Sequence, residues 1–341
     1  MKVDAFTLPT PPAPGKKPLV MVAKRYTSSH QTTPRSGVTL LMLHGLGQHK
    51  EQWEPVMESL YALQVQSESG AEPQAVREAW AFDWQSHGES AVLNEEALKD
   101  GPASASMDRW AAAIASFINS DHVRGHQLVG IGYSMVTTRF FDTCPYVGIV
   151  LIEPSLMDPE LWDTHTEINA AFEGVTNSVK HRRNSWESKE AAYQLISGRP
   201  PWTSYDPRVA KLFVEYAMTT SKDKDGKACV IRSCPSMHEA MAFQFSLQQS
   251  FDGAEQMSKL SGIVPIHAIL AETHGFMPQA IFDCSLDMNK GRKAASITRV
   301  PGTSHTIMQE VPDALGSIIL RLARDIIIMS ASPQVHVRGR L

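Results

Sequence analysis

The residues that could do chemistry begin with a serine in the stretch LVGIGYSMVTT, residues 128–138. Its segment GYSMV matches four of the five positions of Gly-x-Ser-x-Gly, the sharp turn that presents a nucleophilic serine between a strand and a helix. In such a turn the Ser134 hydroxyl is exposed, and the N–H of Met135 faces a developing oxyanion. Val136 replaces the second glycine and adds a branched side chain where helix and strand pass closely. We predict that Ser134 is a nucleophile supported by Gly132, and the alternative is an ordinary buried serine.

A nucleophilic serine needs a base and an acid that orients the base. His305 lies in VPGTSHTIMQEVPDAL, a loop between the last predicted strand and the last helix, and it follows Ser134 in the chain. Two carboxylates stand where predicted strands end. Glu153 closes the strand after the serine, and Glu272 closes the next-to-last strand. We favour Glu153 as the acid and keep Glu272 as the alternative acid, and for either one a capping or solvated carboxylate is the competing interpretation.

A glycine-rich turn, His44-Gly45-Leu46-Gly47, follows an early predicted strand. Glycines let the backbone turn sharply and bring an N–H toward the Ser134 site. We predict that the Leu46 N–H joins that of Met135 in an oxyanion hole, with His44 and Gly45 supporting the turn. A glycine-rich turn without a catalytic duty is the alternative.

The pattern of apolar residues indicates the elements that position these groups. Short, nearly continuous apolar runs are typical of strands buried on both faces of a parallel sheet, and they occupy residues 38–44, 79–84, 126–132 and 146–153. Amphipathic stretches lie between them at residues 50–64 and 106–119. The alternation predicts a mostly parallel, doubly wound α/β sheet. In such a sheet, ligands bind beyond the carboxyl ends of the strands.

This alternation stops after residue 154. Residues 155–261 read as helical without a convincing strand, and strand patterns return at 263–272 and 294–300. We therefore predict a sheet core in two parts, residues 1–154 and 262–341, with an inserted helical lid at residues 155–261. The lid is rich in aromatic and methionine residues that could line an apolar pocket or form the lid core: Trp162, Phe172, Trp186, Trp202, Phe213, Tyr216, Met241 and Phe243. Its basic run KHRR, residues 180–183, reads as a solvated face or as a contact for coenzyme A phosphates.

Composition excludes several classes of function. The 341 residues carry a net charge of −4, and the chain has no apolar run long enough to span a membrane, so we expect neither a nucleic-acid partner nor a membrane span. Gly130-x-Gly132, with Glu153 downstream, imitates a dinucleotide fingerprint, but Met135 stands where its third glycine belongs. We predict no cofactor and no metal, since no metal-ligand spacing occurs. Four cysteines without a paired motif indicate reduced thiols: Cys144, Cys229, Cys234 and Cys284.

Taken together, the motifs MLHGLGQHKEQW, FDWQSHGES, GYSMV, GIVLIEP and VPGTSHTIMQEVPDAL resemble the α/β-hydrolase superfamily in their order. The lid and the LIEP ending are similar to fungal hydrolases of secondary-metabolite and host-selective toxin clusters, including the acyl-CoA hydrolase of the mycophenolic acid pathway. That resemblance implies a helical lid, a Ser-His-acid triad with the acid after the strand that follows the serine, and peroxisomal residence. The ending Gly339-Arg340-Leu341 is a variant of the tripeptide that a peroxisomal import receptor reads. Departures are Val136, a short segment after Ser134 and Gly339.

These observations predict a serine hydrolase that cleaves an acyl thioester of coenzyme A, or an ester, in fungal secondary metabolism. A simple carboxylesterase is one alternative. Val136 also makes credible a hydrolase fold with impaired turnover that binds or cyclises a metabolite. The predicted partners are a small acyl substrate, the import receptor and a second copy in a homodimer, and the location is peroxisomal or otherwise cytoplasmic.

Overall fold

The computed structural model describes residues 1–29, 37–68, 74–134, 143–245, 247–275 and 277–331. Within them, eight strands form one sheet in the order β1-β2-β4-β3-β5-β6-β10-β11. Their bounds are β1 Lys2–Pro9, β2 Val20–Thr27, β3 Val38–Leu43, β4 Val76–Phe82, β5 Leu128–Tyr133, β6 Tyr146–Ile152, β10 Ile266–Ala271 and β11 Ser296–Val300. Every pair from β4 to β11 is parallel, and β1 and β2 add an antiparallel edge. The predicted parallel α/β sheet is confirmed.

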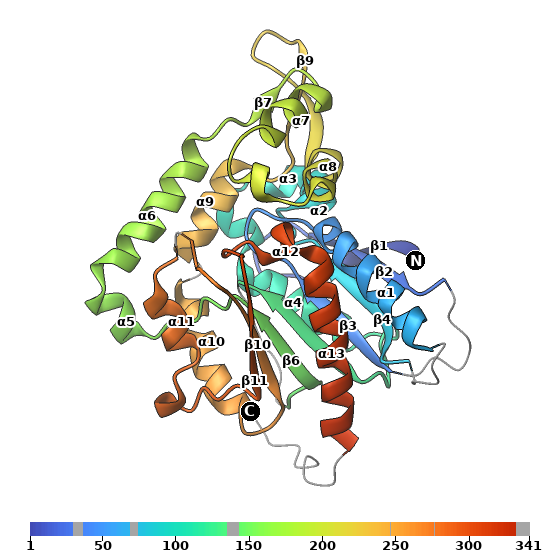
Figure 1. The fold of residues 1–341 in the computed structure, drawn as a ribbon. Coiled ribbons are helices and arrows are strands. Elements are labelled where there is room, and N and C mark those ends of the chain that lie inside the picture. The colour runs from blue at the N-terminus through green and yellow to red at the C-terminus, as the bar shows by residue number, and fades with distance from the viewer. Residues whose placement is uncertain (30–36, 69–73, 135–142, 246, 276, 332–341) are drawn as a thin grey trace.

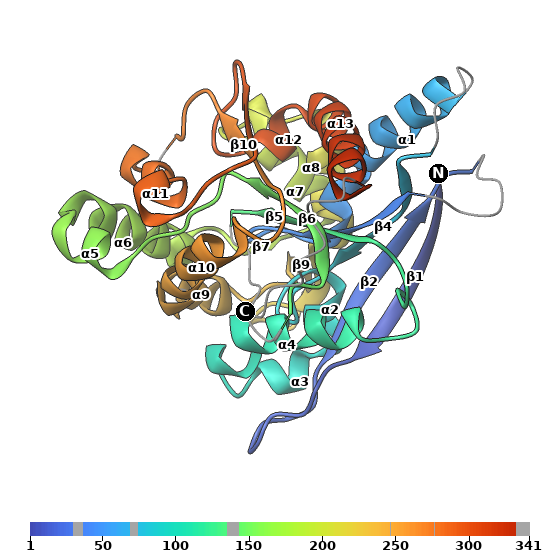
Figure 2. The ribbon, with the colours of Figure 1, turned by 90° about the horizontal axis from the view of Figure 1, so that it is seen from below.

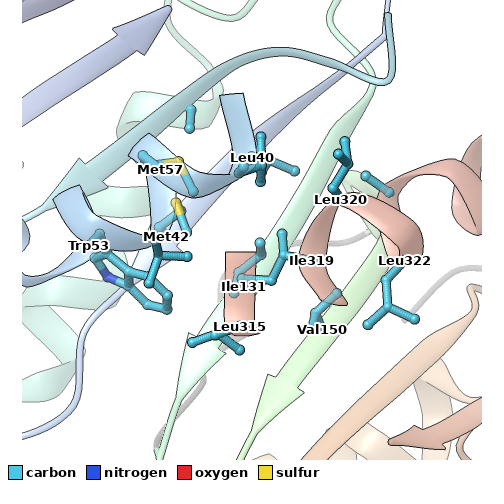
Figure 3. Packing of buried hydrophobic residues seen from close by; sticks show 14 of the residues in the cluster. Leu40, Met42, Trp53, Met57, Ile131, Val150, Leu315, Ile319, Leu320 and Leu322 are labelled. Carbon is cyan, nitrogen blue, oxygen red and sulfur yellow. The ribbon is translucent and has the colours of Figure 1, made fainter. Parts of the chain in front are cut away.

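Two helical layers cover the sheet, as Figures 1 and 2 show. On one face lie α1, Glu54–Glu68, preceded by the short helix η1, Lys50–Trp53, and the final helix α13, Pro312–Ala331. Helices α1 and α13 touch closely at Gly316, where a Cβ atom would lie 2.6 Å from the Val56 carbonyl oxygen. Figure 3 shows their apolar side chains, such as Leu315 and Ile319, packed with Ile131 of β5 and Val150 of β6. Burying such surface is the main free-energy gain that holds the strand ends in register.

The opposite face is covered by α4, Met107–Ile118, and α10, Leu247–Leu260. Ser106 begins α4 as a good cap, because its hydroxyl accepts a hydrogen bond from the Arg109 N–H. Helix α10 falls inside the predicted lid, residues 155–261, yet its Met257 and Leu260 pack in the same core cluster as Ile266 of β10. Parallel strands β6 and β10 need a crossover, and α10 supplies its helix.

The other elements of residues 155–261 extend from the carboxyl ends of the strands (Figure 1). They are α5 Pro159–Thr164, α6 Thr166–His181, β7 Ser185–Trp186, α7 Lys189–Ser197, η3 Trp202–Ser204, α8 Pro207–Tyr216, β8 Met218–Lys222, β9 Ala228–Arg232 and α9 Ser236–Phe245. The prediction of a lid without strands was wrong, because β7, β9 and β8 form a small antiparallel sheet. These strands are short and only partly buried, so they leave no long apolar run in the sequence.

Shorter elements complete the described chain and connect the strands to the site. They are α2 Gly88–Leu93, α3 Glu95–Leu98, η2 Pro102–Ala105, α11 Gln279–Ser285, η4 Met288–Lys290 and α12 Ile307–Glu310. None of the described helices combines the length and apolar composition that crossing a bilayer requires. Met135, Val136 and the short helix expected after Ser134 lie outside the described residues, as does Gly339-Arg340-Leu341.

Candidate active site

Ser134 directly follows β5 and has a backbone φ of 64°, a left-handed value that non-glycine residues adopt rarely. The end of β6 holds this conformation. The Ser134 N–H donates to the Ile152 carbonyl at 2.9 Å, and the Ser134 carbonyl accepts from the Ser155 N–H at 2.9 Å and from the Ser155 hydroxyl at 2.7 Å. Strain of this kind persists only where the surroundings fix it, and it is typical of functional turns. Gly132 lies inside β5 and pairs in register with Leu43 of β3.

Ser134 lines a cavity of about 690 Å³ between the sheet and the lid. Gly45, Leu46 and His305 also line it, so four of the predicted site residues meet at one space. Apolar lid side chains form much of the remaining wall, among them Phe172, Trp202 and Phe213. A cavity of this size and lining suits a small organic ligand.

Glu153 directly follows β6 and also has a left-handed backbone, with φ 47°. Its side chain is completely buried, and its Oε2 lies 3.1 Å from Nδ1 of His305. Its Oε1 accepts a hydrogen bond from the Ala271 N–H at 2.7 Å. Burial alone would raise the pKa of the Glu153 carboxyl, but hydrogen bonds from His305, the Ala271 N–H and His274 outweigh burial and hold the pKa below its ordinary value. The carboxylate is therefore ionised at neutral pH.

Glu272, the alternative acid, is exposed beyond the end of β10. Its Oε2 accepts a hydrogen bond from the Gly302 N–H at 2.7 Å, so it caps the loop that leads to His305. Of the two predicted carboxylates, the geometry brings Glu153 and not Glu272 to the His305 imidazole.

A second imidazole shares the Glu153 carboxylate, and the sequence did not single it out. His274 Nδ1 lies 3.0 Å from Oε2 and 3.2 Å from Oε1 of Glu153, and its ring stacks on Phe282 with centroids 3.6 Å apart. An ionised carboxylate can only accept hydrogen bonds, so both His274 and His305 carry a proton on Nδ1. For His305 that tautomer leaves Nε2 as the nitrogen able to take a proton. The only sequence signal for His274 is its place three residues after β10.

The loop that carries His305 is anchored by the residue before Ser134. The Tyr133 hydroxyl donates to the His305 carbonyl and, at 3.3 Å, to Oε1 of Gln309. Burial raises the pKa of Tyr133 well above its ordinary value, so the hydroxyl keeps its proton and remains a donor. The Tyr133 side chain thus ties the loop of His305 to the end of β5, next to Ser134.

The His44-Gly45-Leu46-Gly47 turn leaves one backbone donor available. The Gly45 N–H donates to Oε1 of Gln48 at 3.2 Å, and the Gly47 N–H donates to Nε2 of His87 at 3.2 Å. Among the described residues nothing accepts from the Leu46 N–H between them. Glycine is required at position 45, because a Cβ atom there would lie 2.9 Å from the Tyr133 ring. The turn can therefore present the Leu46 N–H to an oxyanion.

His44 supports the turn as a neutral side chain. Burial lowers its pKa to about 4, so the imidazole is uncharged at neutral pH. Its Nδ1 donates to the Gly45 carbonyl at 2.8 Å, and its Nε2 accepts from the Trp84 N–H at 3.1 Å.

The residues after this turn form a buried ionic cluster that sequence reasoning missed. Lys50 and Glu51 are fully buried and lie 2.9 Å apart, and Lys50 also bonds Asp83 through Nζ and through its backbone N–H, each at 2.9 Å. In sequence these charges look like the solvated side of a helix. The one sequence feature that points to this cluster is Asp83, directly after β4. Its carboxylate bonds Lys50 at the start of η1 and so holds the chain that follows the glycine-rich turn.

The described residues contain no group of three or more His, Cys, Asp or Glu side chains placed to hold a metal ion. All four cysteines are described, and each is a free thiol.

Comparison with known proteins identifies the family. The model of the alpha/beta hydrolase family matches residues 40–317, which is more than half of the chain, so this chain belongs to the alpha/beta hydrolase family. The predicted fold and the resemblance to that family are confirmed.

A curated relative is the type I acyl-CoA thioesterase mpaH of Penicillium roqueforti, 26% identical over 204 residues. The match covers 57% of this chain and 43% of that protein, so it spans less than half of the relative's length. Among solved structures, the peroxisomal alpha-beta-hydrolase Lpx1 from Saccharomyces cerevisiae is similar with a TM-score of 0.69 and 16% identity, over 98% of this chain and 92% of that one. E-2-(acetamidomethylene)succinate hydrolase is similar with a TM-score of 0.65 and 15% identity, over 96% of this chain and all of that one. The two structures show a shared fold.

Proposed function

We propose that this chain is a serine hydrolase that cleaves acyl thioesters of the acyl-CoA type, with Ser134 as nucleophile, His305 as base and Glu153 as acid. The observation that carries the proposal is the 3.1 Å contact between Glu153 and Nδ1 of His305, on a cavity that the strained Ser134 also lines. The matched thioesterase of Penicillium roqueforti supports the thioester class.

In the first half of the reaction, His305 Nε2 takes the proton from the Ser134 hydroxyl as its oxygen attacks the carbonyl carbon. The Leu46 N–H stabilises the resulting oxyanion, and the Met135 N–H stays a predicted second donor. The intermediate collapses with cleavage of the carbon–sulfur bond, and the leaving thiolate takes the proton from His305. An acyl group then remains on Ser134.

In the second half, His305 takes a proton from water, and the hydroxide oxygen attacks the acyl carbon. The Ser134 oxygen leaves and recovers the proton from His305, which releases a carboxylic acid. Glu153 keeps its negative charge throughout, holds the imidazole in the required tautomer and stabilises the imidazolium.

Ser134→Ala tests the nucleophile. We expect turnover of an acyl-CoA panel to fall by at least about 1,000-fold because alanine removes the attacking hydroxyl, while the neighbouring Ser155 hydroxyl is engaged as a donor to the carbonyl of residue 134. A fluorophosphonate probe should label the wild-type protein at Ser134 and leave Ser134→Ala unlabelled. Ser59→Ala, a half-buried serine on α1 away from the cavity, is the matched control and should retain wild-type turnover. Full activity in Ser134→Ala would contradict the mechanism.

Matched oxygen esters distinguish the thioesterase from a carboxylesterase, the alternative that shares this mechanism. Wild-type protein that accepts the probe but turns over neither class would support the third alternative, a fold with impaired turnover. The role in fungal secondary metabolism, the homodimer, the import receptor and peroxisomal residence through Gly339-Arg340-Leu341 stay predictions.

A further inference from the structure

The lid places in the wall of the cavity an arginine that is paired with no carboxylate of the described residues. Arg232 ends β9 and lines the cavity, and its guanidinium carbon lies 4.6 Å from the centre of the Phe213 ring. Within the described part of the chain, its guanidinium makes no hydrogen bond and no ion pair. A guanidinium has five N–H donors in one plane, so donors remain available while an aromatic ring covers its face.

A second arginine of the same wall shows the contrast. Arg182, just after α6, forms a two-pronged ion pair with Glu239 of α9, in which Nη1 donates to Oε1 at 2.7 Å and Nη2 donates to Oε2. Glu239 is buried, and it is the one carboxylate among the described residues that line the cavity. In the described part of the wall, one negative charge therefore faces two positive charges, which leaves a positive charge at Arg232.

The ion pair of Arg182 and Glu239 lies against the glycine-rich turn of residues 44–47. Oε1 of Glu239 lies 2.5 Å from the position of a Cβ atom at Gly47, so the ion pair rests against the turn itself. The positive charges of Arg182 and Arg232 also contribute to lowering the pKa of His87, after burial and two neighbouring histidines, and His87 is the acceptor for the Gly47 N–H.

Leaving such a cation unpaired is unfavourable. Burial lowers the pKa of Arg232 to about 10, with the Glu239 carboxylate opposing the shift and Arg182 adding to it, so the side chain stays charged at neutral pH. A half-buried charge without a partner has lost part of its hydration, which is unfavourable, and clefts that hold such a charge are typical ligand sites.

We propose that Arg232 binds a carboxylate on the acyl part of the substrate, so that the cavity selects acyl groups ending in an acid over neutral acyl groups of equal length. This inference rests on the proposed function, because it names the substrate class of the same site. The position among Trp202 and Phe213 favours an acyl chain, since those rings offer apolar surface for its methylene groups. A coenzyme A phosphate would present the same anionic chemistry, and the experiment separates the two sources.

The test compares adipyl-CoA with hexanoyl-CoA, together with the N-acetylcysteamine thioesters of the same two acids. Arg232→Gln should lower kcat/KM for both adipyl substrates by about 10- to 100-fold, because a charge-assisted hydrogen bond is lost, and should leave both hexanoyl substrates within about 2-fold. Arg232→Lys should recover part of the adipyl activity. Arg199→Gln, an exposed arginine of the lid, should match wild type.

Loss with both CoA substrates, but not with the N-acetylcysteamine substrates, would assign Arg232 to a phosphate of coenzyme A and overturn the proposal. Equal losses with all four substrates would also overturn it, since a purely structural role predicts them.

A binding measurement keeps this test independent of turnover. In the Ser134→Ala background, calorimetry should show monomethyl adipate binding at least about 10-fold more tightly than methyl hexanoate, and Arg232→Gln should abolish the difference. If the wild-type protein hydrolyses nothing while this preference stands, the proposed function fails and the anion site survives. If hydrolysis proceeds but both esters bind equally, the anion site fails alone.

Discussion

Two neighbouring strands of the sheet end in a glutamate, and the two side chains lie in opposite surroundings. Glu153, after β6, is fully buried and accepts hydrogen bonds from two imidazoles and a backbone N–H. Glu272, after β10, is exposed and accepts a hydrogen bond from one backbone N–H. The left-handed backbone at Glu153 is the difference in local structure. It directs the side chain toward β10, where the Ala271 N–H donates a hydrogen bond to the carboxylate. Whether a carboxylate at a strand end is buried and bonded thus depends more on the backbone turn after the strand than on the place of that strand in the sheet.

We expect the largest difference between the two glutamates when Glu153→Gln is compared with Glu272→Gln. Glutamine at position 153 keeps the shape but removes the charge that fixes the His305 tautomer, so we expect kcat to fall by about 1,000- to 10,000-fold. Steady-state kinetics on the best thioester would measure it. Glu272→Gln should retain kcat within about 3-fold, because its one contact is with a loop N–H at the surface. The reverse ranking would transfer the acid role to Glu272.

A smaller effect is expected when the second imidazole is removed. His274→Phe keeps an aromatic ring against Phe282 but takes one donor from Glu153, so we expect kcat to fall by about 10-fold. The acid limb of the kcat profile should also move to higher pH, since this hydrogen bond helps to lower the Glu153 pKa. His274→Asn, which retains a donor near the Nδ1 position, should recover most of the activity. An unchanged profile in His274→Phe would limit His274 to a packing role.

The smallest effect concerns the stability of the fold in acid. The pKa of Glu153 is lowered on folding, so its ionised form stabilises the protein fully above its ordinary pKa of 4.5, and this contribution is lost as pH falls through the lowered value. Urea unfolding at a series of acidic pH values should therefore show a shallower loss of stability in Glu153→Gln than in wild type. Glu272→Gln should follow wild type. Parallel curves for all three proteins would contradict the assignment of this pKa shift.

Much of this site follows from residues that short motifs and strand ends mark. Ser134 and the Gly45 turn each lie where a buried parallel strand stops, and buried strands leave clear apolar runs. The His305 loop follows β11, a half-exposed edge strand, and was placed by its position between the last strand and the last helix. The groups that contact Glu153 could not be predicted in the same way, because its burial depends on a backbone turn and on chain segments far away in the sequence. The His274 contact and the buried Lys50 cluster were missed for the same reason, since a charged residue in sequence looks solvated until its partner is placed. The β8–β9 hairpin was missed because only one of its sides is buried.

The partners of Glu153 also set an order for assembling the protein. Ala271, His274 and His305 lie 118, 121 and 152 residues after it in the chain. While the chain is being synthesised, β6 is the free edge of the sheet, and its terminal carboxylate must stay hydrated because a buried charge without partners is strongly unfavourable. The carboxylate can be buried only when β10 and the His305 loop have docked, because they supply its partners. A nascent or truncated chain that ends before β10 therefore has a partial sheet, and its Glu153 carboxylate has none of these three partners.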